Sequence, residues 1–250
     1  MSVNLFVVGT TRSGTSALRN ALTETRYTGH GEGHTIGLLG ALYETIERNF
    51  EEHKEALKFG TMLADWKRDI FWKDIVAAYV RQIRLQFPGG FYLDKTPNIL
   101  PLKYAKLIEA SLDGSRFIFC RRRGIDNIIS KQRKWPDVSF HEHCTEWSDI
   151  IEHWDRLKVE LKSPILEIDF YEMFAARELL ATRVADFLEL PEDERARFYE
   201  RLVQTQPATQ PWVPLSQSGW SDEKARTFLD VCRPVMERYN YGLESYWAAR

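Results

Sequence analysis

The stretch Gly-Thr-Thr-Arg-Ser-Gly-Thr-Ser at residues 9–16 indicates the fold of this chain. It follows an apolar run at residues 3–8 and precedes the apolar-rich residues 17–22, which is the order strand, glycine loop, helix. The spacing matches the nucleotide-triphosphate loop G-x-x-x-x-G-K-[ST], except that Thr15 occupies the lysine position. We therefore predict a phosphate-binding loop without the lysine that ordinary ATP chemistry uses.

The residue types of this loop suit an anion. Its two glycines allow backbone angles that side chains forbid, so that successive N–H groups can point at one oxyanion. The following helix adds its positive end, and a guanidinium can hold an oxyanion through two parallel hydrogen bonds. The alternative is a plain structural turn with a solvent-facing arginine. The predicted anion-binding residues are Arg12, Ser13, Gly14, Thr15 and Ser16.

Composition sets limits on the class of protein. The 250 residues are 44% hydrophobic and 28% charged, with a formal net charge of −2, which is ordinary for a globular protein. We expect one domain over residues 1–250, with no nucleic-acid footprint and no membrane span. The three cysteines are odd in number and lack metal-ligand spacing. These features, with a strand at the N-terminus, favour a cytoplasmic protein without a signal peptide.

Four short apolar runs, at residues 3–8, 91–93, 116–120 and 164–168, predict buried parallel strands. Helical periodicity separates and follows them: residues 147–161, 179–188 and 228–239 each place apolar side chains on one face, and Pro191 is expected to close the second of these helices. The alternation predicts an α/β fold with a doubly wound, mainly parallel sheet.

Polar segments follow the first three predicted strands. They are the glycine loop, the run Asp94-Lys95-Thr96-Pro97, and the segment from Arg121 to Ser130. Because ligands bind at the carboxyl ends of the strands in such sheets, we expect these loops to meet in one site. Residues 38–88 form a helical, aromatic-rich insertion, whose aromatic side chains we expect mostly to be core or packing residues; some could instead wall an acceptor pocket.

These segments together resemble a sulfotransferase that uses 3′-phosphoadenosine 5′-phosphosulfate (PAPS). The loop at residues 9–16 is similar to the family's P-R-S-G-T-[ST] loop for the 5′-phosphosulfate, with Thr11 in place of the proline. The family binds the 3′-phosphate with an arginine and a serine eight residues apart, a spacing that Arg122 and Ser130 match. Residues 165–190 and 220–241 resemble the family's closing strand and helices.

The resemblance implies a donor with two anionic groups, and the chain offers one loop for each. An enzyme that uses a nucleoside triphosphate would instead need the loop lysine and an acidic magnesium ligand. Sulfuryl transfer carries less charge and can proceed without a metal. The missing lysine then indicates PAPS as the donor, with no metal cofactor.

An acceptor hydroxyl must lose its proton as it attacks sulfur, which requires a general base near the loop. The segment Gly29-His30-Gly31-Glu32-Gly33-His34 offers one carboxylate and two imidazoles. The resemblance to tyrosylprotein-type and bacterial carbohydrate-type sulfotransferases implies that Glu32 is the base. His30 and His34 remain rivals on chemistry alone, and a flexible glycine-rich connector is the non-catalytic alternative.

Three further groups of residues could belong to the site: Lys95 with Arg12, the arginines beside Arg122, and the run at residues 141–144. The resemblance implies that Lys95 stabilises the bridging oxygen and that Arg12 assists at the sulfuryl group; a surface lysine paired with Asp94 is the alternative. Arg121 and Arg123 are not expected to share the phosphate-binding role of Arg122. The run at residues 141–144, His-Glu-His-Cys, is not a zinc motif, and we predict no metal there.

The sequence thus predicts a sulfotransferase that moves a sulfuryl group from PAPS to an acceptor hydroxyl by in-line displacement. A carbohydrate, a glycolipid or a small metabolite is the expected acceptor, and a homodimer is left open. Two alternatives remain: a small-molecule kinase with a variant phosphate loop, and a catalytically inactive nucleotide-binding module.

Overall fold

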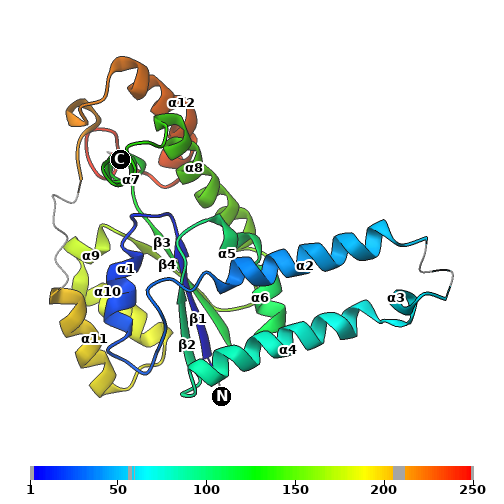
Figure 1. Cartoon of the computed structure of the whole chain (residues 1–250). Helices are drawn as coiled ribbons and strands as arrows, with labels where there is room; N and C mark the ends of the chain where they lie inside the picture. The colour runs from blue at the N-terminus through cyan, green and yellow to red at the C-terminus, as the bar shows by residue number, and fades with distance from the viewer. Residues whose placement is uncertain (1–2, 56–57, 59, 205–211, 249–250) are drawn as a thin grey trace.

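The computed structural model describes residues 3–55, 58, 60–204 and 212–248. At its centre lies a four-stranded, all-parallel sheet in the order β2-β1-β3-β4 (Figure 1). The strands are β1 (Val3–Gly9), β2 (Phe91–Lys95), β3 (Ser115–Arg121) and β4 (Ile165–Asp169). The α/β fold is confirmed, and each predicted strand is present with ends shifted by two residues or fewer.

Helices cover both faces of this sheet, as the doubly wound prediction requires. Side chains alternate along a strand, so Phe6 and Phe117 enter one apolar cluster while Leu5 and Ile118 enter another on the opposite face. The first face is covered by α5 (Ile99–Lys103), α6 (Ala105–Ser111), α7 (Gly124–Lys134), α8 (Phe140–Leu157) and α12 (Asp222–Arg238). The second is covered by α1 (Thr15–Leu22), α9 (Glu172–Ala175), α10 (Arg177–Phe187) and α11 (Glu192–Gln204).

Local sequence signals explain where these helices begin and end. Ser139 and Glu142 form a reciprocal capping box at the start of α8. Within α8, Trp154 stacks on Phe119 of β3 with ring centroids 4.6 Å apart, which fixes this helix on the sheet. The role expected for Pro191 is wrong: α10 ends at Phe187, and the Pro191 carbonyl instead accepts the first backbone hydrogen bonds of α11.

The helical segment between β1 and β2 projects from the body of the molecule. It comprises α2 (Thr35–Glu52), α3 (Met62–Asp65) and α4 (Arg68–Gln86), and α2 and α4 form a long hairpin (Figure 1). The aromatic side chains here are packing residues, one of the two roles expected, since no residue of α4 is fully buried, while Tyr79 and Phe87 pack against the edge of the core. Other aromatic side chains pack within the hairpin, as Tyr43 does on Trp72, with ring centroids 5.1 Å apart. Phe59 lies outside the described residues.

The register of the sheet brings three loops to one edge. Val7 of β1 is paired with Lys95 of β2, and Gly9 is paired with Cys120 of β3. The strands therefore end side by side, and the segments that follow them begin within a few ångströms of one another.

Candidate active site

A cleft of about 620 Å³ opens at this carboxyl edge. Eight of the nine predicted site residues line it, and Ser13 is the exception. The loops after β1, β2 and β3 all contribute, together with the segment that precedes α2. The residues that line the cleft are Thr11, Arg12, Gly14, Thr15, Ser16, Glu32, Lys95, Pro97, Asn98, Arg122, Ser130, Arg133, Lys134, Trp135 and Phe170.

The phosphate loop has the backbone geometry of an anion site. Gly9 and Gly14 have φ angles of 136° and 83°, which confirms the need for glycine. Arg12 also has a positive φ of 65°, a conformation that costs a non-glycine residue free energy and that clusters at functional sites. No described side chain caps the N-terminus of α1, so its first N–H groups stay available to an anion.

The side chain of Ser13 is buried behind the loop, which leaves its backbone N–H as the group that could contact an anion. There its hydroxyl contacts that of Thr10 and lies 3.2 Å from Asn127 Nδ2. The same amide nitrogen donates to the Thr11 carbonyl at 2.7 Å. Asn127 is fully buried and thus fastens the phosphate loop to α7. Sequence reasoning missed it; its one signal is its place between Arg122 and Ser130.

The two predicted anion loops contact each other through their functional side chains. Arg12 Nε donates to Ser130 Oγ at 3.0 Å, and Arg122 Nη1 donates to the Arg12 carbonyl at 3.2 Å. Arg122 is largely buried over the ring of Phe170, 4.2 Å from its centroid, and burial lowers the pKa of the guanidinium. Its buried Nε has no hydrogen-bond partner among the described residues. An unpaired buried donor of this kind is costly unless a ligand accepts from it.

On the other side of the phosphate loop, Lys95 joins two segments. Its Nζ lies 2.6 Å from Glu32 Oε1 and 3.4 Å from Ser16 Oγ, and the side chain is almost fully buried. The hydrogen bond from Lys95 is the main reason that the pKa of Glu32 lies below its ordinary value. The alternative pairing of Lys95 with Asp94 is wrong, since that carboxylate points the other way and accepts from Tyr92 and Thr96.

The sequence and the fold were compared with those of known proteins. Residues 4–194 match the sequence profile of the sulfotransferase family. The chain belongs to the sulfotransferase family. None of the curated protein sequences matches it.

Solved structures of sulfotransferases share this member's fold. The sulfotransferase domain from the Synechococcus PCC 7002 olefin synthase has a TM-score of 0.57 at 17% identity, over 90% of this chain and 94% of that one. STF9 from Mycobacterium avium has a TM-score of 0.57 at 14% identity, over 98% and 78%. Mouse SULT7A1 complexed with PAP has a TM-score of 0.52 at 14% identity, over 94% and 84%.

Asp94 positions the loop that carries Glu32 in this sulfotransferase. Its buried carboxylate lies so close to Gly33 that a Cβ added there would be 1.7 Å from Oδ2. Thr96, which donates to Asp94 at 2.7 Å, also accepts from the backbone N–H of His34 at 3.4 Å. Burial raises the pKa of Asp94. The end of β2 thus carries Lys95 and, through Asp94, contacts the backbone next to Glu32.

The two histidines of this loop lie in different places. His34 Nε2 is 3.0 Å from Glu32 Oε2, and its side chain is exposed. His30 points away from the cleft, against Phe87, and its Nε2 is 2.9 Å from the side-chain nitrogen of Gln86. Of the two imidazoles, His34 is therefore the one in contact with the candidate base.

Arg121 and Arg123 have structural partners outside the cleft. Arg121 lies between Glu167 and Asp169 at 3.4 and 3.6 Å. Arg123 is fully buried, pairs with Asp126 at 2.8 Å and donates to backbone carbonyls of the C-terminal segment. Of the three consecutive arginines, Arg121 and Arg123 therefore have structural roles, and Arg122 lines the cleft.

The cluster at residues 141–144 is part of α8. Glu142 closes the capping box, and His143 Nε2 lies 3.2 Å from the Trp135 carbonyl. Within the described residues, no three His, Cys, Asp or Glu side chains are grouped so as to hold a metal ion. None of the described helices is long and apolar enough to cross a membrane. The aromatic side chains described between residues 38 and 88 do not line the cleft.

Proposed function

We propose that this chain transfers a sulfuryl group from PAPS to an acceptor hydroxyl. One observation supports this most: the loop of Arg12 contacts both Ser130 of α7 and Arg122 in the loop before α7, and the Glu32–Lys95 pair lies in the same cleft. A donor with separate 5′ and 3′ anionic groups fits two such sites. The likeness of the fold to mouse SULT7A1, whose structure holds PAP, supports the same donor.

We assign the anions of PAPS to the unpaired donors of the cleft. The free N–H groups at the start of α1, with the Ser16 hydroxyl, would hold the 5′-phosphosulfate. Arg122 and Ser130 would hold the 3′-phosphate, and the unpartnered Nε of Arg122 is the donor that such a phosphate would satisfy. Arg12 lies between the two groups through its contact with Ser130.

The chemistry follows from the Glu32–Lys95 pair. The acceptor oxygen forms the new bond to sulfur as its proton passes to the Glu32 carboxylate, while the bond from sulfur to the bridging 5′-phosphate oxygen breaks. Lys95 and Arg12 stabilise the charge that develops on that oxygen and on the sulfuryl group. The products are a sulfate ester and 3′-phosphoadenosine 5′-phosphate (PAP), so atoms and charge balance without a metal.

For the acceptor we propose a carbohydrate, a glycolipid or a small metabolite. The part of the cleft not assigned to the donor offers the amide of Asn98, the indole of Trp135 and the cations Arg133 and Lys134. Such a mixture suits a polar molecule with an apolar or ring face. We place the reaction in the cytoplasm, because the three cysteines are buried and free.

Phosphoryl transfer is the second candidate. Lys95 Nζ lies 3.4 Å from Ser16 Oγ, so a lysine from β2 approaches the loop whose own lysine position holds Thr15. A kinase with this arrangement would still need Mg²⁺ to bridge the phosphates. The two functions therefore differ in the required nucleotide and in the need for Mg²⁺.

Thermal unfolding with added nucleotides tests the donor. At a concentration of about 100 times its Kd, PAP should stabilise the protein by about 2.7 kcal/mol, without Mg²⁺. Adenosine 5′-phosphate, which lacks the 3′-phosphate, should give a much smaller shift at the same concentration. A shift given only by ATP with Mg²⁺ would support the kinase instead. Equal shifts with and without the 3′-phosphate would contradict PAPS as the donor.

A further inference from the structure

The hairpin of α2 and α4 projects from the sheet with little to cover it (Figure 1). We call the helices α2, α3 and α4 together the arm. Its helices contact each other, and the arm packs against the core only at its base, through Ile36 at the start of α2 and through Tyr79, Val80 and Ile83 of α4. The distal half reaches beyond the body of the protein.

The arm exposes apolar side chains that a helix ordinarily buries. Eleven of the 19 residues of α4 are apolar, yet none of the 19 is buried. Leu38, Met62, Ile70 and Leu85 are 61%, 76%, 53% and 66% exposed. Amphipathic helices owe most of their stability to covering an apolar face, so this surface needs a partner.

The total exposed area supports the same conclusion. The chain exposes 13,423 Å² for a mass of 29.3 kDa. A compact monomer of this mass exposes about 11,500 Å². The difference, about 1,900 Å², exceeds the roughly 800 Å² that each partner buries in an interface of standard size. A projecting hairpin adds exposed area of this kind, and an interface of standard size would cover less than the excess of the whole chain.

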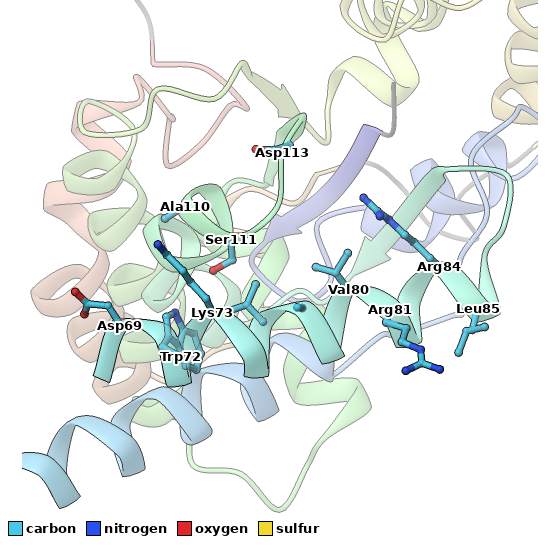
Figure 2. A pocket seen from close by; sticks show the side chains of 12 residues that line it. Asp69, Trp72, Lys73, Val80, Arg81, Arg84, Leu85, Ala110, Ser111 and Asp113 are labelled. Carbon is cyan, nitrogen blue, oxygen red and sulfur yellow. The ribbon is translucent and has the colours of Figure 1, made fainter. Parts of the chain in front are cut away.

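A groove along α4 shows what kind of partner fits. It has a volume of about 850 Å³ and runs between α4 and the residues at the end of α6 (Figure 2). Trp72, Val76 and Val80 supply apolar walls, while Lys73 and Arg84 extend from α4 toward the side of α6. Together with Arg81, these cations have no ion-pair partner among the described residues, although Asp69 and Asp113 also line the groove.

The charges of the two arm helices are complementary. The side chains of α2 carry four glutamates and one arginine, a net charge of −3, while α4 carries four cations and two aspartates, a net charge of +2. The helix α2 runs outward to Glu51 and Glu52 near the tip, and α4 runs inward to Arg81 and Arg84 near the base. Two arms placed antiparallel about a twofold axis would bring the tip of one beside the base of the other.

We propose that the arm is a homodimerisation element whose partner is the arm of a second copy of this chain. The two arms pack antiparallel, and α4 of each copy buries its exposed apolar side chains. Glu51 and Glu52 of one copy face Arg81 and Arg84 of the other. This inference does not depend on the proposed reaction.

Charge reversal in full-length protein tests the pairing by sedimentation equilibrium. The unchanged protein should sediment at twice the 29.3 kDa chain mass at micromolar concentration. The double variant Arg81→Glu/Arg84→Glu should weaken dimerisation at least tenfold, because like charges then face each other. Glu51→Lys/Glu52→Lys should do the same. An equimolar mixture of the two variants should recover the dimer.

A matched control uses an exposed apolar residue outside the arm. Val159 is 80% exposed, so Val159→Asp should leave dimerisation unchanged, whereas Val76→Asp should weaken it. Circular dichroism confirms that each variant is folded. A monomeric unchanged protein, or a mixture that stays monomeric, overturns the proposal. A monomer that binds anionic phosphatidylserine vesicles through the arm also overturns it and assigns the arm to a membrane surface.

Discussion

Lys95 Nζ lies 2.6 Å from Glu32 Oε1, although the two residues are 63 positions apart in the chain. The lysine is almost fully buried while the carboxylate is partly open to solvent. An ion pair of this kind places a proton acceptor and a cation on the same side of the phosphate loop. Variants that remove either member of this ion pair test the proposed roles of Glu32 as base and Lys95 as electrostatic catalyst.

We expect Glu32→Gln to lower turnover by roughly a hundredfold or more, because the amide cannot take the acceptor proton. Affinity for PAP should change little, since the assigned donor contacts lie elsewhere in the cleft. Steady-state kinetics and a binding titration measure the two effects. His30→Gln is the matched control and should keep normal turnover, because His30 points away from the cleft. Normal turnover in a folded Glu32→Gln variant would remove Glu32 as the base.

The pH dependence of kcat/KM should report the same pair. Hydrogen bonding by Lys95 lowers the pKa of Glu32, so the base stays ionised, and activity is lost only as pH falls through this lowered pKa. In Lys95→Met the largest cause of the lowering disappears. The acidic limb of the profile should therefore move to higher pH, in addition to any loss in rate. A limb that stays in place would show that another group titrates there.

Arg122→Ala should weaken PAP binding by about 1.5–3 kcal/mol, the scale of a hydrogen bond to a charged group. Binding of adenosine 5′-phosphate should change far less, because it has no 3′-phosphate to lose the contact. Isothermal titration of both ligands against both proteins gives the comparison. Equal losses for the two nucleotides would assign Arg122 to some other part of the donor.

Gly33→Ala should displace the loop that carries Glu32. A Cβ there would lie 1.7 Å from Asp94 Oδ2, which is a steric clash. The Asp94 carboxylate is buried and is held by hydrogen bonds from Tyr92 and Thr96. We expect turnover to fall at least tenfold, on the principle that small misplacements of catalytic groups are costly, while PAP still binds. Gly31→Ala is a close control, since a Cβ at Gly31 meets nothing within 4 Å. If both variants were equally active, the support of the Glu32 loop by Asp94 would be wrong.

Asn127→Ala should both destabilise the protein and weaken donor binding. Its Nδ2 donates to the Thr11 carbonyl at 2.7 Å, and its removal leaves buried polar groups of the loop without a partner. The cost in free energy of unfolding should be about 1–3 kcal/mol. Denaturant unfolding and a PAP titration measure the two effects. Unchanged PAP affinity in this variant would show that the loop holds its shape without α7.

Much of the fold followed from local patterns. The apolar runs predicted all four strands, because buried parallel strands are short and apolar on both faces. The polar segments after three of them predicted one site, because parallel strands end at the same sheet edge. For residues 38–88 the sequence left core and packing roles open, since apolar periodicity shows which face of a helix needs cover but not what provides it.

Chain order and residue type alone determined the phosphate loop, the missing lysine at Thr15 and the arginine–serine spacing of Arg122 and Ser130, because these depend on short-range geometry. Only the tertiary structure decided that Lys95 contacts Glu32 rather than Asp94, that Ser13 lies behind the loop, and that the arm stands away from the core. Contacts between residues far apart in sequence depend on how strands and helices pack, and a single sequence contains no local signal for them.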